Sequence, residues 1–151
     1  MTHKVRPRPL SLDEIVKFRT EHLPYRLHLI KDAVSRVPAK TVADCQAFEA
    51  AAVSGRLLLD FLGVGFDPKD QILREARTYH SADDVKVIDI GGRYVEIDKL
   101  TKADFEILAR FIHGVHKACA HLTLGSNHGL DVPTFQQATP IILRLYEENK
   151  N

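Results

Sequence analysis

The run "CQAFEAAAVSGRLLLDFL", residues 45–62, constrains the fold of this chain more than any other feature. At about 100° per residue, its charged side chains Glu49, Arg56 and Asp60 fall on one narrow side of a helix. The rest of the circumference is apolar or small, so other segments must cover it. The sequence therefore predicts a central helix, with Thr41 as its N-cap, inside a helical bundle.

Further helices follow from capping residues and from prolines. Ser11 precedes Glu14 by three residues, which is the capping-box spacing, and Pro24 is expected to end the helix that starts there. Thr101 repeats the capping pattern before a fifth helix, and Pro140 suits the first turn of a last one. The expected helices besides the central one cover about residues 11–22, 25–37, 71–80, 102–122 and 140–148.

The stretch "VKVIDIGGRYVEI" reads differently, as two β-rich runs joined by Gly91 and Gly92. Two adjacent glycines suit a two-residue hairpin turn that needs positive φ at both positions. The predicted fold class is therefore mainly α, a bundle of about five to six helices with one small β-hairpin inserted at about residues 85–97.

Length and charge limit the domain organisation and the partners. A chain of 151 residues and 17.0 kDa fits one helical domain, residues 11–151, after a flexible basic arm, residues 1–10. Pro7 and Pro9 interrupt the basic cluster of Lys4, Arg6 and Arg8 in that arm, so we expect solvated side chains there, or phosphate contacts as the alternative. The formal charge of +1 gives no long-range field for RNA or an anionic membrane.

The apolar content and the cysteines point to the cytoplasm. The sequence has no run of 18 or more apolar residues, and no apolar segment follows the basic start, so neither secretion nor a membrane partner is expected. Cys45 and Cys119 lie far apart without C-x-x-C spacing, which indicates buried thiols. No phosphate loop, nucleophile elbow or dinucleotide fingerprint occurs, so no cofactor is expected.

The helix expected at 102–122 carries several histidines on its polar face. His113 and His116 are three residues apart and could share a metal ion, yet no H-E-x-x-H frame supplies further ligands, so we expect a solvated face and no native metal. Arg110 and His116 form an R-x5-H pair, which resembles the R-x4-6-H motif of the HEPN superfamily of helical nucleases.

Two segments together resemble a family of uncharacterised bacterial helical proteins with a "(H)ARNLLDF" helix and a later "(H)LT" helix end. The segments here are "FEAAAVSGRLLLDFLGV" and "HKACAHLTLG", and Asp83-Asp84 between them is also similar to that family. The matched positions are Arg56, Leu57, Leu58, Asp60, Phe61, His121, Leu122 and Thr123. The resemblance implies a HEPN-like bundle and a dimer, but no activity.

Arg56, Asp60, His121 and Thr123 are the candidate site residues, on the hypothesis that they meet where their two helices pack. Arg56 and Asp60 are one helical turn apart and could form an ion pair. Such a cluster is either a buried polar network that fixes the helix register, or a small-anion or RNA-phosphate site with His121 as acid and base.

Three functions remain open on these observations. The leading one is a non-catalytic helical bundle that acts through protein association as a homodimer, since the small residues of "AAAVSG" let another helix approach closely. The alternative is a HEPN-like ribonuclease or RNA-binding module that uses Arg110 with His116, or Arg56 with His121. The third is a metal-dependent hydrolase that uses His113 and His116.

Overall fold

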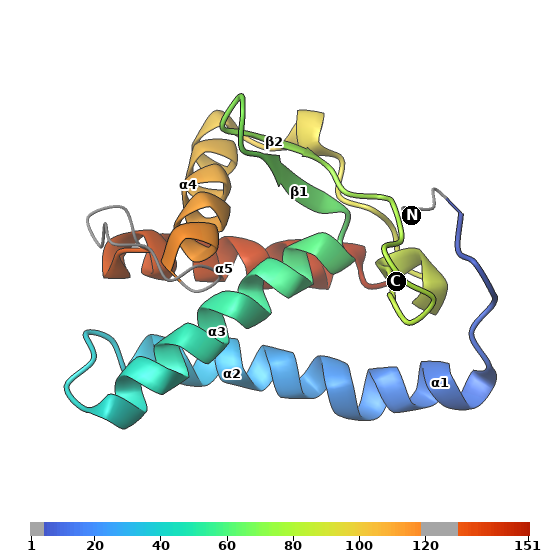
Figure 1. The fold of residues 1–151 in the computed structure, drawn as a ribbon, viewed down its shortest axis with the longest axis horizontal. Helices are drawn as coiled ribbons and strands as arrows, with labels where there is room; N and C mark the ends of the chain where they lie inside the picture. Colours follow the sequence, from blue (N-terminus) through green and yellow to red (C-terminus); the bar gives the residue numbers. More distant parts are fainter. Residues whose placement is uncertain (1–4, 119–129) are drawn as a thin grey trace.

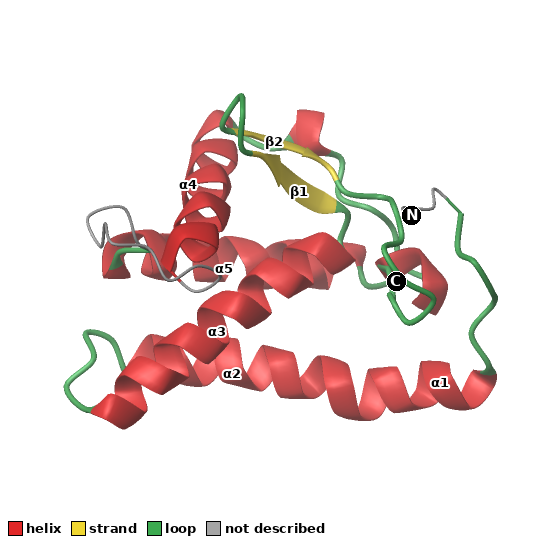
Figure 2. Cartoon of the chain, in the orientation of Figure 1, coloured by secondary structure: helices red, strands yellow, loops and turns green. Residues whose placement is uncertain are grey.

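The computed structural model describes residues 5–118 and 130–151 of the chain. It is mainly α-helical with one small two-stranded antiparallel sheet, which confirms the predicted fold class (Figure 2). Long helical segments cover residues 12–35, 42–61, 102–118 and 132–149, so within the described residues the bundle has fewer long helices than expected.

The first long segment joins α1, Leu12–Lys17, the π-helical turn η1, Phe18–His22, and α2, Leu23–Ser35. The predicted capping box is present, because Ser11 and Glu14 exchange side-chain and backbone hydrogen bonds. The break expected at Pro24 is wrong. In η1 the backbone N–H of Leu23 donates to the carbonyl of Phe18, and this wider turn lets the helix continue through the proline.

The central helix α3, Val42–Phe61, starts at the predicted Thr41 cap and packs against α2, α4 and α5 (Figure 1). Its small residues Ala51, Ala52, Ser54 and Gly55 are all buried within the chain. A Cβ atom added at Gly55 would lie 2.9 Å from Cζ of Phe111, so the glycine allows α4 to approach. The small-residue run is therefore used for packing inside the chain.

The hairpin lies earlier in the sequence than expected. Strand β1, Val64–Asp67, pairs antiparallel with β2, Ile72–Glu75, with Val64 opposite Glu75 and Asp67 opposite Ile72. The Asp67 side chain accepts hydrogen bonds from the backbone of Lys69 and Asp70 and so stabilises the turn. The helix predicted at 71–80 is wrong, because β2 occupies its start.

The segment expected to be a hairpin at 85–97 forms two short 3-10 helices instead, η2, Val87–Ile90, and η3, Ile97–Lys99. Gly91, with φ of 87°, ends η2. Gly92 lets the end of α5 approach, since an added Cβ there would lie 2.5 Å from the carbonyl oxygen of Asn149. The glycine pair thus serves a helix end and a long-range contact rather than a hairpin turn.

The last two helices are α4, Lys102–Ala118, and α5, Val132–Asn149. Thr101 caps α4 as predicted, and the expected extension of this helix to residue 122 lies outside the described residues. The expected start of α5 at Pro140 is wrong, because Asp131 caps the helix and Pro140 lies inside it. Pro140 is on the exposed side of α5, where water can bond the carbonyl that a proline leaves unpaired.

Two further observations concern the cysteines and the apolar character of the helices. Cys45 is exposed, contrary to the expectation of a buried thiol, because the buried part of α3 begins only at Ala51. Cys119 lies outside the described residues. Among the helices of residues 5–118 and 130–151, none combines the length and the apolar character needed to span a membrane.

Candidate functional site

A groove with a volume of about 500 Å³ lies between the α1–α2 helix, the C-terminal half of α3 and the loop at residues 83–85. Drug-sized ligands occupy pockets of roughly 300–1,000 Å³, so the groove is of that size. Phe18 and Phe61 meet in it with ring centroids 5.5 Å apart. The apolar lining comprises mainly Phe18, Leu23, Leu57, Leu58, Phe61 and Val85.

One wall of the groove comes from the α1–α2 helix and carries the cations Lys17 and Arg26, the imidazole of His22 and the carboxylate of Glu14, and is called the helical or cationic wall below. In a regular α-helix, Lys17 and His22 would lie about 140° apart around the axis. The π-helical turn η1 takes up an extra residue between them, so both side chains face the groove. Arg26 donates a hydrogen bond of 3.3 Å from Nη1 to the buried hydroxyl of Ser54.

The opposite wall is the loop that carries Asp83 and Asp84. Asp84 accepts hydrogen bonds from the backbone N–H groups of His80 and Ser81 and from the Ser81 hydroxyl. Burial raises the pKa of Asp84, but these hydrogen bonds outweigh burial and hold the pKa below its usual range. The Asp84 carboxylate is therefore occupied in shaping the loop, whereas the Asp83 carboxylate has no hydrogen bond to another described residue.

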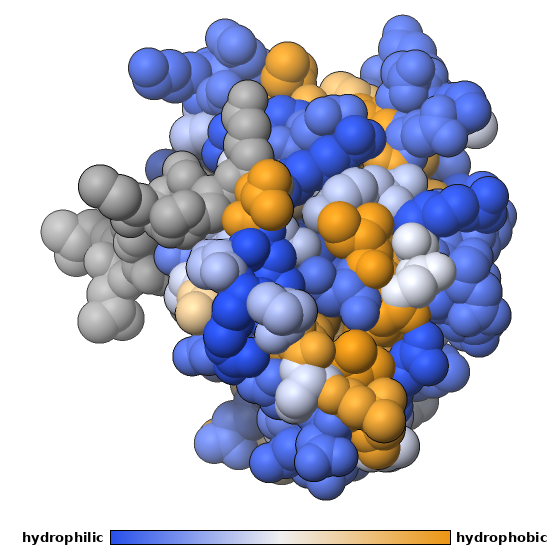
Figure 3. Space-filling model, turned by 90° about the vertical axis from the view of Figure 1, so that its right-hand side faces the viewer, coloured by the Kyte–Doolittle hydropathy of each residue, from blue (hydrophilic) through white to orange (hydrophobic). Residues whose placement is uncertain are grey.

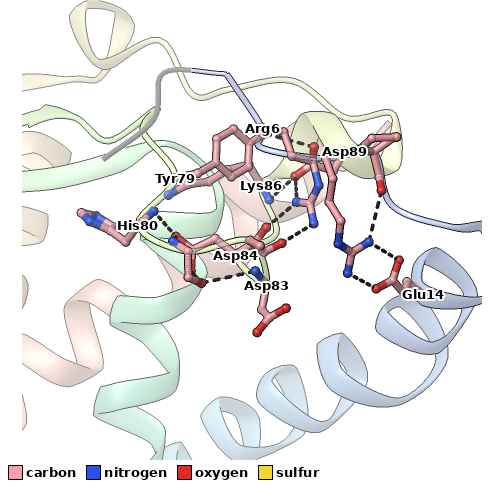
Figure 4. Close-up of polar contacts among 12 residues, drawn as sticks. Arg6, Glu14, Tyr79, His80, Asp83, Asp84, Lys86 and Asp89 are labelled. Carbon is pink, nitrogen blue, oxygen red and sulfur yellow. Dashed lines mark hydrogen bonds and ion pairs between the residues drawn. The ribbon is translucent and has the colours of Figure 1, made fainter. Parts of the chain in front are cut away.

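A buried ionic network holds this loop in place (Figure 4). Arg6 donates to the backbone carbonyls of Ala82 and Asp84 and forms a 3.1 Å ion pair with Asp89. Asp89 also accepts a hydrogen bond of 3.0 Å from the Tyr79 hydroxyl. The Arg6 and Asp89 side chains are only 9% and 10% exposed, so Arg6 departs from the expectation of a solvated arm.

Lys86 continues the network toward the groove. Its side chain is 1% exposed, and Nζ lies 2.6 Å from Oδ2 of Asp60 and 3.0 Å from the Asp60 carbonyl oxygen. Asp60 itself lines the groove and is 44% exposed. A buried ammonium group needs such partners, and the Lys86 ammonium in turn compensates the negative charge of Asp60 in the groove.

Two pKa shifts reflect these contacts. A bidentate ion pair from Arg8, with a backbone hydrogen bond from Ser11, lowers the pKa of Glu14 to about 2. Burial, followed by the hydrogen bond to Asp89, raises the pKa of Tyr79 far above its usual range. Tyr79 is therefore a neutral hydrogen-bond donor, and Glu14 at the rim of the groove is ionised and paired with Arg8.

The predicted site residues are only partly placed. Asp60 lines the groove, but it pairs with Lys86 rather than with Arg56, so the expected Arg56–Asp60 ion pair is wrong. Within the described residues Arg56 makes no hydrogen bond or ion pair. His121 and Thr123 lie outside the described residues, so their meeting with Arg56 and Asp60 stays a prediction.

The other histidine candidates lie on α4. His113 and His116 are half-buried and pack against the ring of Phe66 in β1, at centroid distances of 5.6 and 6.5 Å. This contact with the hairpin departs from the expected solvated face. Arg110 is exposed on the same helix. Among the described residues no group of three or more His, Cys, Asp or Glu is arranged to hold a metal ion.

Sequence reasoning missed the residues that build the network, namely Arg6, Tyr79, Lys86 and Asp89. No local signal marked Lys86 as buried, because a lysine between two valines is typical of a strand with its polar side chains toward solvent. Its partner Asp60 is distant in the sequence, so no local pattern indicates the pair.

Comparisons of the chain with protein-family models, with curated proteins and with solved structures give no match. The resemblances to the "(H)ARNLLDF" family and to HEPN proteins therefore stay predictions.

Proposed function

We propose that this chain is a non-catalytic helical domain that associates with a second copy of itself through the start of α1. The observation that carries the proposal is a set of exposed apolar side chains, Leu12 and Val16 on α1 and Ile88 on η2, which are 75%, 50% and 46% exposed and are called the patch below. Leu12 and Val16 are one helical turn apart, and a hydrogen bond from Arg19 to the carbonyl of Ile90 links η1 to η2 beside them.

The end of the molecule that carries this patch is seen in Figure 3, where apolar side chains form a broken band between hydrophilic flanks. Apolar patches with polar rims are typical of protein interaction surfaces. A second copy suits this patch because the formal charge is only +1, which leaves little repulsion between copies, and two-fold dimers are the commonest assemblies.

The catalytic alternatives have less support. The Asp60 carboxylate forms an ion pair with Lys86, and His113 and His116 pack on Phe66. No observation favours a ribonuclease or a hydrolase over association, so these functions are not proposed further.

Sedimentation equilibrium tests the association. We expect the wild-type chain to have twice its chain mass of 17.0 kDa, and the double variant Leu12→Glu with Val16→Glu to have the mass of one chain. Val42→Glu is the matched control, because Val42 is 76% exposed on α3, outside the patch, and its substitution leaves the dimer intact. A wild-type chain that stays monomeric at high concentration would refute the proposal.

A further inference from the structure

The groove is separate from the proposed dimer patch. At about 100° per residue, the groove-lining residues Glu14 of α1 and Phe18 at the start of η1 lie roughly opposite Leu12 and Val16 around the helix axis. A ligand in the groove and a second copy on the patch can therefore bind at the same time, and each can be tested without the other.

Once the existing ion pairs are assigned, the remaining charges of the groove lie on opposite walls, with Lys17 and Arg26 on the helical wall and Asp83 and Asp84 on the loop. Arg8 and Glu14 pair with each other, Asp60 pairs with Lys86, and both oxygens of Asp84 accept hydrogen bonds from its own loop. Asp83 keeps a carboxylate without a hydrogen bond to a described residue, and its charge acts on Arg8.

The cations on the helical wall are left over. Neither Lys17 nor Arg26 forms an ion pair with any residue in the described part of the chain; the partners of Arg26 are the neutral Ser54 hydroxyl and the ring of Tyr25. His22 adds a further donor beside them. An anionic group beside this wall would gain charge-assisted hydrogen bonds without displacing any existing partner.

The rest of the groove lining is mainly apolar. Phe18 and Leu23 come from the helical wall and Phe61 from α3, and Leu57 on α3 is 44% exposed. A small free anion such as phosphate would leave this surface in water. An aliphatic chain attached to the anion would cover it and gain the free energy of removing apolar surface from water.

We propose that the groove binds a free amphipathic carboxylic acid of fatty-acid type, with its carboxylate on Lys17 and Arg26 and its chain over Phe18, Phe61 and Leu57. The volume of about 500 Å³ accommodates one such molecule. The buried network of Arg6 and Lys86 holds the far wall in place, so the groove is formed before the ligand arrives.

Isothermal titration calorimetry with matched ten-carbon probes tests this inference. We expect decanoate to bind with one molecule per chain and decylammonium, of equal chain length and opposite charge, to bind at least about tenfold more weakly. The double variant Lys17→Gln with Arg26→Gln weakens decanoate about tenfold and does not weaken decylammonium. Lys31→Gln with Lys40→Gln removes two exposed charges outside the groove and leaves both affinities unchanged.

A substitution in the apolar lining tests the contacts of the aliphatic chain. Leu57→Asn, at a half-exposed position, weakens both probes while the circular dichroism spectrum of the chain stays that of wild type. Equal affinity for decanoate and decylammonium, or no binding of decanoate to the folded wild-type chain, would overturn the inference.

Discussion

The two sides of α3 differ in the interactions that position the surrounding segments. On one side the small residues Ala51, Ala52 and Gly55 bring α2, α4 and α5 into direct contact. On the other side Leu57 and Asp60 face a groove whose far wall is fixed by the buried ionic network of Arg6, Lys86 and Asp89. Van der Waals packing thus positions the helices on the first side, whereas hydrogen bonds and ion pairs position the groove wall on the second.

Removing the network's shared acceptor should have the largest effect. Asp89→Ala leaves the buried Arg6 without its ion pair and Tyr79 without its acceptor, which we expect to lower the free energy of unfolding by about 3–5 kcal/mol. At roughly 2–4 °C per kcal/mol, the melting temperature falls by about 10 °C in a thermal scan. The control Asp70→Ala changes an exposed carboxylate and should have no effect; a stable Asp89→Ala would show that the network does not hold the wall.

The packed side should respond to the addition of a single methyl group. Alanine is ordinarily better than glycine in a helix by roughly 0.5–1 kcal/mol, but the Cβ of Gly55→Ala would meet the buried Phe111 ring at 2.9 Å. Overpacking costs typically about 1–3 kcal/mol, so we expect a net loss of roughly 1 kcal/mol by urea unfolding. Leu57→Ala on the groove side is the matched control and should change stability by less than about 0.5 kcal/mol.

The local parts of this comparison could be predicted from the sequence, and the long-range parts could not. The caps at Ser11, Thr41 and Thr101 were found because their partners lie three residues away. The burial of α3 followed from its apolar circumference. Lys86 and Asp60 are 26 residues apart, so their ion pair leaves no local pattern.

The misplaced hairpin has a similar cause. The alternation in "VKVID" is typical of a strand, yet here it serves a 3-10 helix whose polar residues Lys86 and Asp89 bond inside the protein. Gly92 is needed for contact with the end of α5, which cannot be inferred from its neighbours. Tertiary contacts thus overrode the local β propensity.

The smallest expected effect concerns the rim of the groove. Glu14 should titrate in the folded chain with a pKa of about 2, as measured by carboxyl ¹³C NMR, and Arg8→Gln should move the pKa toward the ordinary value of about 4.3. Because folding lowers this pKa, the stability that the pair contributes is present above the unfolded value and is lost as the pH falls toward 2. Lys31→Gln should leave the Glu14 titration unchanged, and a wild-type pKa near 4.3 would contradict the ion pair.

The most direct test of the division of α3 into a packed side and a binding side is a methyl NMR titration with decanoate. The account predicts shifts and intermolecular contacts at Leu57, Leu58 and Val85, and unchanged signals from Ala52 and Ile142 on the packed side. Decanoate that shifts the packed-side methyl groups, or that leaves the groove methyl groups unchanged at saturating concentration, would contradict it.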